Sequence, residues 1–143
     1  MGGLSVRDPV PGLSTTIADE LLRPHRCYYK SVYPLIEEGA DVYAISHITG
    51  GGIHDNLVRV MPSDTQAVIE RRSWMPLPIF QLIQDVGQVP ESEMFRAFNM
   101  GIGMILIVDK DAAAGILQRL NQAGEAAAVI GYLQTGSQDV QIV

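Results

Sequence analysis

The chain has 143 residues, of which 47% are hydrophobic and 18% are charged, the composition of one ordinary globular domain with a real core. Sixteen Asp and Glu against ten Lys and Arg give a net charge of −6, and the basic residues are scattered, so no nucleic-acid partner is expected. The single Cys27 fits a reducing, cytoplasmic location, and the longest apolar stretch, residues 100–108, is too short to span a membrane.

The first third of the chain predicts two helices after an irregular lead-in. Residues 1–13 hold turn formers and two prolines, so they predict irregular backbone ahead of a single α/β domain over residues 14–143. Thr15 or Thr16 can cap a short helix, and residues 28–39 predict a second one. The apolar positions expected to face the core on these helices are Ile17, Leu21, Leu22, Val32, Leu35 and Ile36.

The rest of the chain alternates strands with helices. Residues 41–49 are apolar without a polar face, which is typical of an internal strand. Ile53, Leu57 and Val60 recur on one helical face. The remaining predicted elements are a strand over 65–70, helices over 78–87 and 91–98, a strand at the end of 98–109, a helix over 111–124 and a strand over 127–135. This order indicates the α/β class of the α+β type, with a mixed sheet covered by helices.

Three adjacent glycines, Gly50, Gly51 and Gly52, join the predicted strand over 41–49 to the next helix. A helix N-terminus carries unpaired N–H groups and a partial positive charge, and glycines let a phosphate or carboxylate reach these donors. A tight turn that needs only the dihedral freedom of glycine explains the pattern equally well. The polar side chains expected on or near the exposed side of this turn are His47, Thr49, His54, Asn56 and Arg59.

A second glycine motif, with Asn99, Gly101 and Gly103, runs into a strand, which is the reverse of a dinucleotide-binding fingerprint. It predicts either a backbone wall beside a ligand, with Asn99 as the polar contact, or a bulge with close strand packing. Each isolated histidine is expected to be packed or solvated. No catalytic residue and no metal site are assigned, because the chain shows no complete set of such side chains.

Four segments of the chain occur together in one known family. They include the motifs HITGGG and FNMGIGM, and they span residues 21–37, 46–62, 67–84 and 93–108. On these segments the chain resembles aminoimidazole ribonucleotide synthetase, also called phosphoribosylformylglycinamidine cyclo-ligase. The residues that match family positions, which the resemblance implies bind substrate or phosphate, are His47, Thr49, Gly50, Gly51, Gly52, Arg59, Asn99, Gly101 and Gly103.

The resemblance covers only the C-terminal domain of a two-domain enzyme. It implies a fold truncated at its N-terminus, because the Ser-Asn-Gly segment of the family is absent. In the complete enzyme, ATP and Mg2+ would activate an amide oxygen of formylglycinamidine ribonucleotide, and ring closure would give aminoimidazole ribonucleotide for purine biosynthesis. Most ligands of ATP and Mg2+ would lie in the missing domain, so the chain alone is expected to be inactive and homo-oligomeric. The alternative is a non-catalytic binding or oligomerisation module of the same fold.

Overall fold

The strands of the described residues form two small sheets. The structure is a computed structural model that describes residues 3–143. One sheet is an antiparallel pair, and the other has three strands in the order β4-β2-β5, with β2 antiparallel to β4 and parallel to β5. The strands are β1 (Val42–His47), β2 (Thr65–Ile69), β3 (Met104–Val108), β4 (Gly131–Thr135) and β5 (Asp139–Ile142). The α+β class is confirmed, and the strands are divided between two sheets, of which one is mixed.

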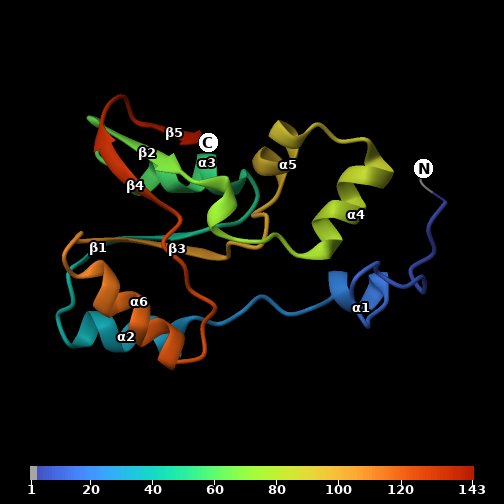
Figure 1. Ribbon diagram of the computed structural model, residues 1–143, viewed down its shortest axis with the longest axis horizontal. Helices are drawn as coiled ribbons and strands as arrows, with labels where there is room; N and C mark the ends of the chain where they lie inside the picture. Colours follow the sequence, from blue (N-terminus) through green and yellow to red (C-terminus); the bar gives the residue numbers. More distant parts are fainter. Residues whose placement is uncertain (1–2) are drawn as a thin grey trace.

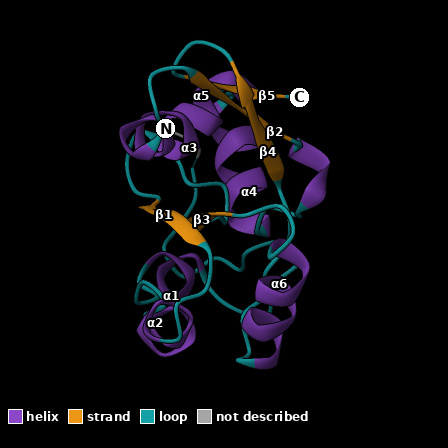
Figure 2. Cartoon of the chain, turned by 90° about the vertical axis from the view of Figure 1, so that its left-hand side faces the viewer, coloured by secondary structure: helices purple, strands orange, loops and turns teal. Residues whose placement is uncertain are grey.

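The β1–β3 pair lies in the middle of the molecule (Figure 1). It was expected to supply an internal strand, but within the described residues β1 pairs with β3 alone. The α2 and α6 helices lie on one side of the pair and α3 with the three-stranded sheet lies on the other, as both views show (Figures 1 and 2). Only Ser46 of β1 is buried, whereas Tyr43 and His47 are exposed, so the strand is less enclosed than its apolar sequence predicts.

All the predicted helices form. They are α1 (Ile17–Leu21), α2 (Tyr29–Glu37), α3 (Gly52–Leu57), α4 (Pro78–Gly87), α5 (Glu91–Ala97) and α6 (Ala113–Gln122), with 3-10 turns η1 (Val58–Val60) and η2 (Arg71–Ser73). The Thr16 hydroxyl caps α1 by accepting from the Asp19 amide at 3.2 Å. Pro78 opens α4 at a position where its missing N–H costs nothing. Gly39 ends α2 in the left-handed region.

The main core lies between α3, β2, β3 and β5. Its buried members are Ile48, Ile53, Leu57, Met61, Ala67, Ile69, Ile105 and Val140. A second cluster of Met94, Phe95 and Met100 packs under α5. Three positions expected in the core are instead exposed: Leu21 by 60%, Leu22 by 80% and Ile36 by 50%. A five-residue α1 has one inward face, which Ile17 occupies against Val10 and Ile79, so the leucines at its end reach solvent.

Candidate functional site

The two glycine motifs meet at one end of the β1–β3 ladder. Because the strands are antiparallel, the end of β1 lies beside the start of β3, and His47 is paired with Met104. The Ile48 amide extends the ladder by donating to the Gly103 carbonyl at 3.0 Å. The loop over residues 48–52 therefore lies beside the loop over 99–103. The sequence predicted both motifs but not their meeting, since it does not show how the strands pair.

Two of the three adjacent glycines are required by the fold. Gly51 and Gly52 have φ values of 92° and 61°, in the left-handed region that favours glycine. A Cβ on Gly52 would lie 1.9 Å from the Phe95 carbonyl oxygen, because the backbone of α5 passes directly over the turn. A Cβ on Gly51 would lie 2.7 Å from the Cβ of Asp55. These two positions are explained without any ligand.

Gly50 is different from its two neighbours. It is exposed, its φ lies outside the left-handed region, and a Cβ placed on it would meet no atom of the described chain within 4 Å. Neither backbone strain nor close packing therefore accounts for a glycine here. Of the three, Gly50 is the position at which an absent side chain leaves the backbone open to solvent.

The turn is held from inside by Asn56. This side chain was expected on the exposed side, but it is 5% exposed and bonds to the backbone of the turn. Its amide nitrogen donates to the carbonyls of Gly52 at 2.7 Å, Gly50 at 3.2 Å and Thr49 at 3.4 Å. Its oxygen accepts from the Thr49 hydroxyl at 3.3 Å. Asn56 thus draws three carbonyl groups to one side of the turn.

This arrangement fixes the direction of two amide groups. In a trans peptide the N–H points opposite to the preceding carbonyl, and the structure has no cis peptide bond in its described residues. Since the Thr49 and Gly50 carbonyls face Asn56, the N–H groups of Gly50 and Gly51 face away from it. The Gly52 amide is already bonded to the Thr49 carbonyl at 3.1 Å. N–H groups placed in this way can donate to an anion.

The second loop uses its polar atoms to hold its own shape. The Asn99 side-chain oxygen accepts from the Gly101 amide at 3.0 Å, so it is engaged in a local turn. Met100 is buried with a φ of 50°, and its carbonyl accepts from the Trp74 indole at 3.0 Å. A Cβ on Gly103 would lie 2.1 Å from the Tyr28 hydroxyl. Close packing therefore explains Gly103.

A third segment, residues 25–28, joins the two loops. The Nε2 atoms of His25 and His47 are 3.0 Å apart. The Tyr28 phenol lies against Gly103, and burial, followed by the charge of Glu125, raises its pKa above the ordinary value, while Arg26 opposes the shift. Nothing in the sequence pairs His25 with His47, because the two positions are 22 residues apart and belong to no common motif.

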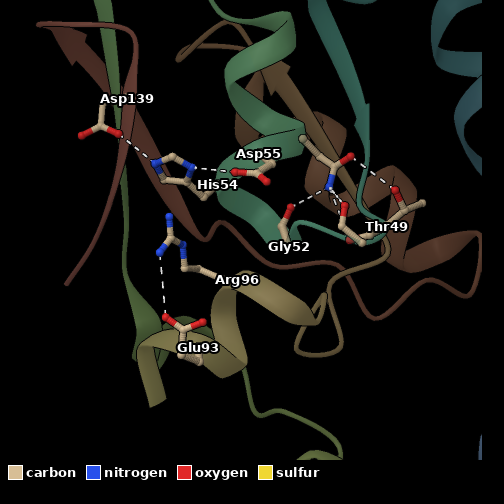
Figure 3. A network of polar contacts seen from close by, with 9 residues as sticks. Thr49, Gly52, His54, Asp55, Glu93, Arg96 and Asp139 are labelled. Atoms are coloured by element: carbon tan, nitrogen blue, oxygen red, sulfur yellow. Dashed lines mark hydrogen bonds and ion pairs between the residues drawn. The ribbon is translucent and has the colours of Figure 1, made fainter. Parts of the chain in front are cut away.

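Two of the polar residues expected beside the glycine turn lie elsewhere. Arg59 is exposed in η1, about two helical turns or roughly 10 Å past Gly52 along the helix axis. His54 turns toward β5, with its Nδ1 3.1 Å from Asp55 and its Nε2 3.0 Å from Asp139 (Figure 3). The structure brings His47, Thr49, Gly50–Gly52 and Asn99–Gly103 together, and it leaves Arg59 apart from them.

Neither a metal cage nor a membrane span is found in residues 3–143. No group of three or more His, Cys, Asp and Glu side chains there is placed to hold a metal ion. The donor set of this part of the chain therefore does not fit Mg2+, which prefers several carboxylate or water oxygens. No helix among the described residues is both long and apolar enough to cross a bilayer.

Comparison with known proteins assigns the chain to a protein family. Residues 3–143 match the family described as AIR synthase related protein, C-terminal domain, and the chain belongs to this family. Several curated relatives are named phosphoribosylformylglycinamidine cyclo-ligase. The protein of Geotalea uraniireducens is 42% identical over 144 residues, which cover 99% of this chain and 41% of the relative. The resemblance drawn from the glycine motifs is thereby confirmed.

Other relatives agree in name and extent. The cyclo-ligase of Brevibacillus brevis is 43% identical over 138 residues, covering 96% of this chain and 40% of the relative. That of Syntrophus aciditrophicus is 45% identical over 131 residues, covering 92% and 38% respectively. The chain thus spans about 40% of the length of the curated relatives that it matches.

Proposed function

We propose that this chain is the C-terminal, substrate- and phosphate-binding portion of an ATP-dependent cyclo-ligase, which converts formylglycinamidine ribonucleotide to aminoimidazole ribonucleotide in purine biosynthesis. The observation that carries the proposal is the meeting of both family motifs at one end of the β1–β3 ladder. The names of the curated relatives support the reaction. The enzyme acts in the cytoplasm.

The glycine turn supplies the phosphate contact. The N–H groups of Gly50 and Gly51 face away from the buried Asn56, and the open space at Gly50 lets a phosphate oxygen approach them. Backbone donors fixed by the fold favour an anion without rearranging when it binds. The wider set of substrate-binding residues is His47, Thr49, Gly50, Gly51, Gly52, Asn99, Gly101 and Gly103, and Arg59 contributes only if the ligand extends beyond the turn.

Most ligands of ATP and Mg2+ in the complete enzyme lie outside this chain. Residues 3–143 place no cluster of carboxylates for Mg2+, and the sequence has no phosphate-binding lysine loop. What this chain does is hold one anionic substrate in position for phosphoryl transfer, a reaction in which positioning and charge stabilisation supply most of the catalysis. Alone it is inactive, so turnover by the purified chain above a Gly50→Ala control would contradict the proposal.

The chain also self-associates. Leu4, Val6 and Leu21 are 48%, 63% and 60% exposed, and with α4 they line an apolar groove. Uncovered apolar surface of this kind promotes association. Light scattering that shows a monomer at high concentration would count against this part of the proposal.

The binding role is tested by a pair of matched glycine variants. Gly50 and Gly115 are both exposed, have φ outside the left-handed region, and offer open space to a Cβ. Gly50→Ala is expected to weaken binding of formylglycinamidine ribonucleotide and of inorganic phosphate about tenfold in calorimetric titration, whereas Gly115→Ala changes neither. The stability of Gly50→Ala should stay within about 0.5 kcal/mol of the parent. Equal affinities for all three proteins would show that the glycines form only a turn.

A further inference from the structure

Two histidines from separate segments, His25 and His47, are hydrogen-bonded to each other beside the glycine loops. The Nε2 atoms of His25 and His47 are 3.0 Å apart, with ring centroids separated by 4.6 Å and planes at 79°. The Nδ1 atom of His25 lies 3.0 Å from the Arg26 carbonyl oxygen. These three groups form a chain of two hydrogen bonds that ends on His47, the residue from which the HITGGG motif starts.

The chemistry of the three groups determines which atom donates and which accepts in each of these two hydrogen bonds. A carbonyl oxygen can only accept, so the Nδ1 of His25 must carry the proton that it donates to Arg26. A neutral imidazole has one N–H, which leaves the Nε2 of His25 as an acceptor. The Nε2 of His47 must therefore be the donor in the contact between the rings. Neutral His47 then has an unprotonated Nδ1.

Arg26, at which this series of hydrogen bonds begins, is bonded to other parts of the protein. The Arg26 side chain pairs with Glu125 at 2.6 Å and donates to the Gly124 carbonyl at 2.8 Å, which ties this segment to the end of α6. Ser31 donates to the same Glu125 carboxylate at 2.8 Å from the first turns of α2. The Arg26 side chain is thus bonded to the end of α6, and its partner Glu125 is bonded in turn to α2; both histidine rings are exposed.

We propose that His25 is a positioning residue for His47. It fixes the ring and the tautomer of His47, so that His47 offers its unprotonated Nδ1 as a hydrogen-bond acceptor to a hydroxyl or N–H group of the bound ligand. In residues 3–143 no protein donor bonds to this Nδ1. Formylglycinamidine ribonucleotide carries ribose hydroxyls and N–H groups in addition to its phosphate, so this acceptor binds a part of the ligand that the glycine turn does not contact. The role of His47 in binding the ligand rests on the proposed function, whereas the assignment of the two histidine tautomers does not.

The tautomers are measured by nitrogen NMR on the 15N-labelled chain at mildly alkaline pH, where imidazole is neutral. We expect a scalar coupling across the N–H···N bond between the two Nε2 atoms. We also expect His25 in its Nδ1–H form, the less common form of free histidine. His54, which contacts carboxylates, should show no such coupling. Absence of the coupling together with an Nε2–H form of His25 would overturn the proposal.

Substitution of His25 separates positioning from simple packing. His25→Ala should release His47 into a mixture of tautomers and weaken binding of formylglycinamidine ribonucleotide about three- to tenfold. His25→Gln keeps an acceptor oxygen for the Nε2–H of His47, so it should restore both the tautomer and most of the affinity. His54→Ala is the control and should leave the signals of His47 unchanged.

Two outcomes distinguish this inference from the function on which it rests. If the coupling is present but formylglycinamidine ribonucleotide does not bind, the proposed function fails and the fixed tautomer stands. If the ligand binds but His25→Ala changes neither the His47 tautomer nor the affinity, His25 has no positioning role and the inference is wrong.

Discussion

The two glycine loops that meet at the end of the β1–β3 ladder use their glycines differently. In the first loop, Gly52 is forced by a backbone carbonyl at 1.9 Å, which cannot move without shifting α5. In the second loop, Gly103 is forced by the Tyr28 hydroxyl at 2.1 Å, the end of a side chain that can rotate. Replacing a glycine by a larger residue is therefore expected to lower the free energy of unfolding by a different amount in each loop. The loss depends on whether the added Cβ would meet a fixed backbone atom or a side-chain atom that can move.

The loops also differ in how they are held. In the first loop, three carbonyls accept hydrogen bonds from one buried side chain, Asn56, which belongs to α3. The second loop is bonded by Trp74 and Asn99 at its periphery and keeps Met100 at a φ of 50°. A non-glycine residue in this region costs about 1–3 kcal/mol, and such strain is common at functional sites. We therefore expect the first loop to be rigid and the second to yield more easily.

Gly52→Ala should give the largest effect. The new Cβ meets the Phe95 carbonyl and also sits at a φ of 61°, so both overpacking and backbone strain oppose it. We expect a loss of about 3–5 kcal/mol in the free energy of unfolding, measured by urea denaturation. Gly50→Ala, which meets nothing, is the control. Similar stabilities for the two variants would remove the distinction drawn between these neighbouring glycines.

Asn56→Ala should rank second. It removes the side-chain donor shared by the carbonyls of Thr49, Gly50 and Gly52, and the contact with Gly52, which is fully buried, is the most costly to lose. We expect about 2–3 kcal/mol by the same denaturation measurement, with faster hydrogen exchange at the turn. Asn121→Ala is the matched control, because Asn121 also makes three contacts with backbone groups but does so where water can replace them. An equal loss in both variants would show that burial of Asn56 contributes nothing.

Gly103→Ala should cost less, about 1–2 kcal/mol, because the Tyr28 ring can move aside. Removing the hydroxyl in Tyr28→Phe takes away the nearest atom, and the next contact, with the ring carbon Cζ, lies at 3.1 Å. The double variant should therefore recover part of the loss, giving a coupling energy of about 0.5–1 kcal/mol in a double-mutant cycle. Additive effects would mean that the loop, rather than Tyr28, absorbs the added methyl group.

Local patterns were enough to predict the helices and the two motifs. The helix over 78–87 has its proline at the first position, and its bounds are as predicted. Asn56 could also have been placed correctly. It lies three residues after Ile53 and four before Val60, on the helical face that was already assigned to the core. Its polarity, rather than its position, led to the wrong expectation that it was exposed.

Features that depend on pairing between distant segments could not be predicted. The strand β5 was missed because residues 137–143 are mostly polar, and it is ordered by parallel pairing with β2. β4 begins at Gly131 and not at residue 127, since the ladder with β2 covers only Gly131–Thr135. The contact of His25 with His47 has the same origin. A single sequence shows that a segment is extended but not which partner it meets.

The smallest expected effect concerns the contact between the helix that follows the first loop and β5. His54, in the helix that follows the glycine turn, contacts Asp139 of β5 at 3.0 Å (Figure 3). The backbone N–H of Val140, and after it the His54 imidazole, favour the charged carboxylate and hold the pKa of Asp139 below its ordinary value of 3.8. A lowered folded pKa stabilises the protein above the ordinary value, and the benefit is lost as the pH falls through the folded pKa.

Asp139→Asn should therefore remove part of the acid dependence of stability. Both side chains are about half exposed, with 41% for His54 and 49% for Asp139, so screening by water keeps the contribution below about 0.5 kcal/mol. We expect the parent to be slightly more stable than Asp139→Asn near neutral pH, and the two unfolding curves to converge below the lowered pKa. Thermal unfolding followed across this range measures the difference. A gap that instead widens as the pH falls would show that the link to β5 does not depend on the charged form of Asp139.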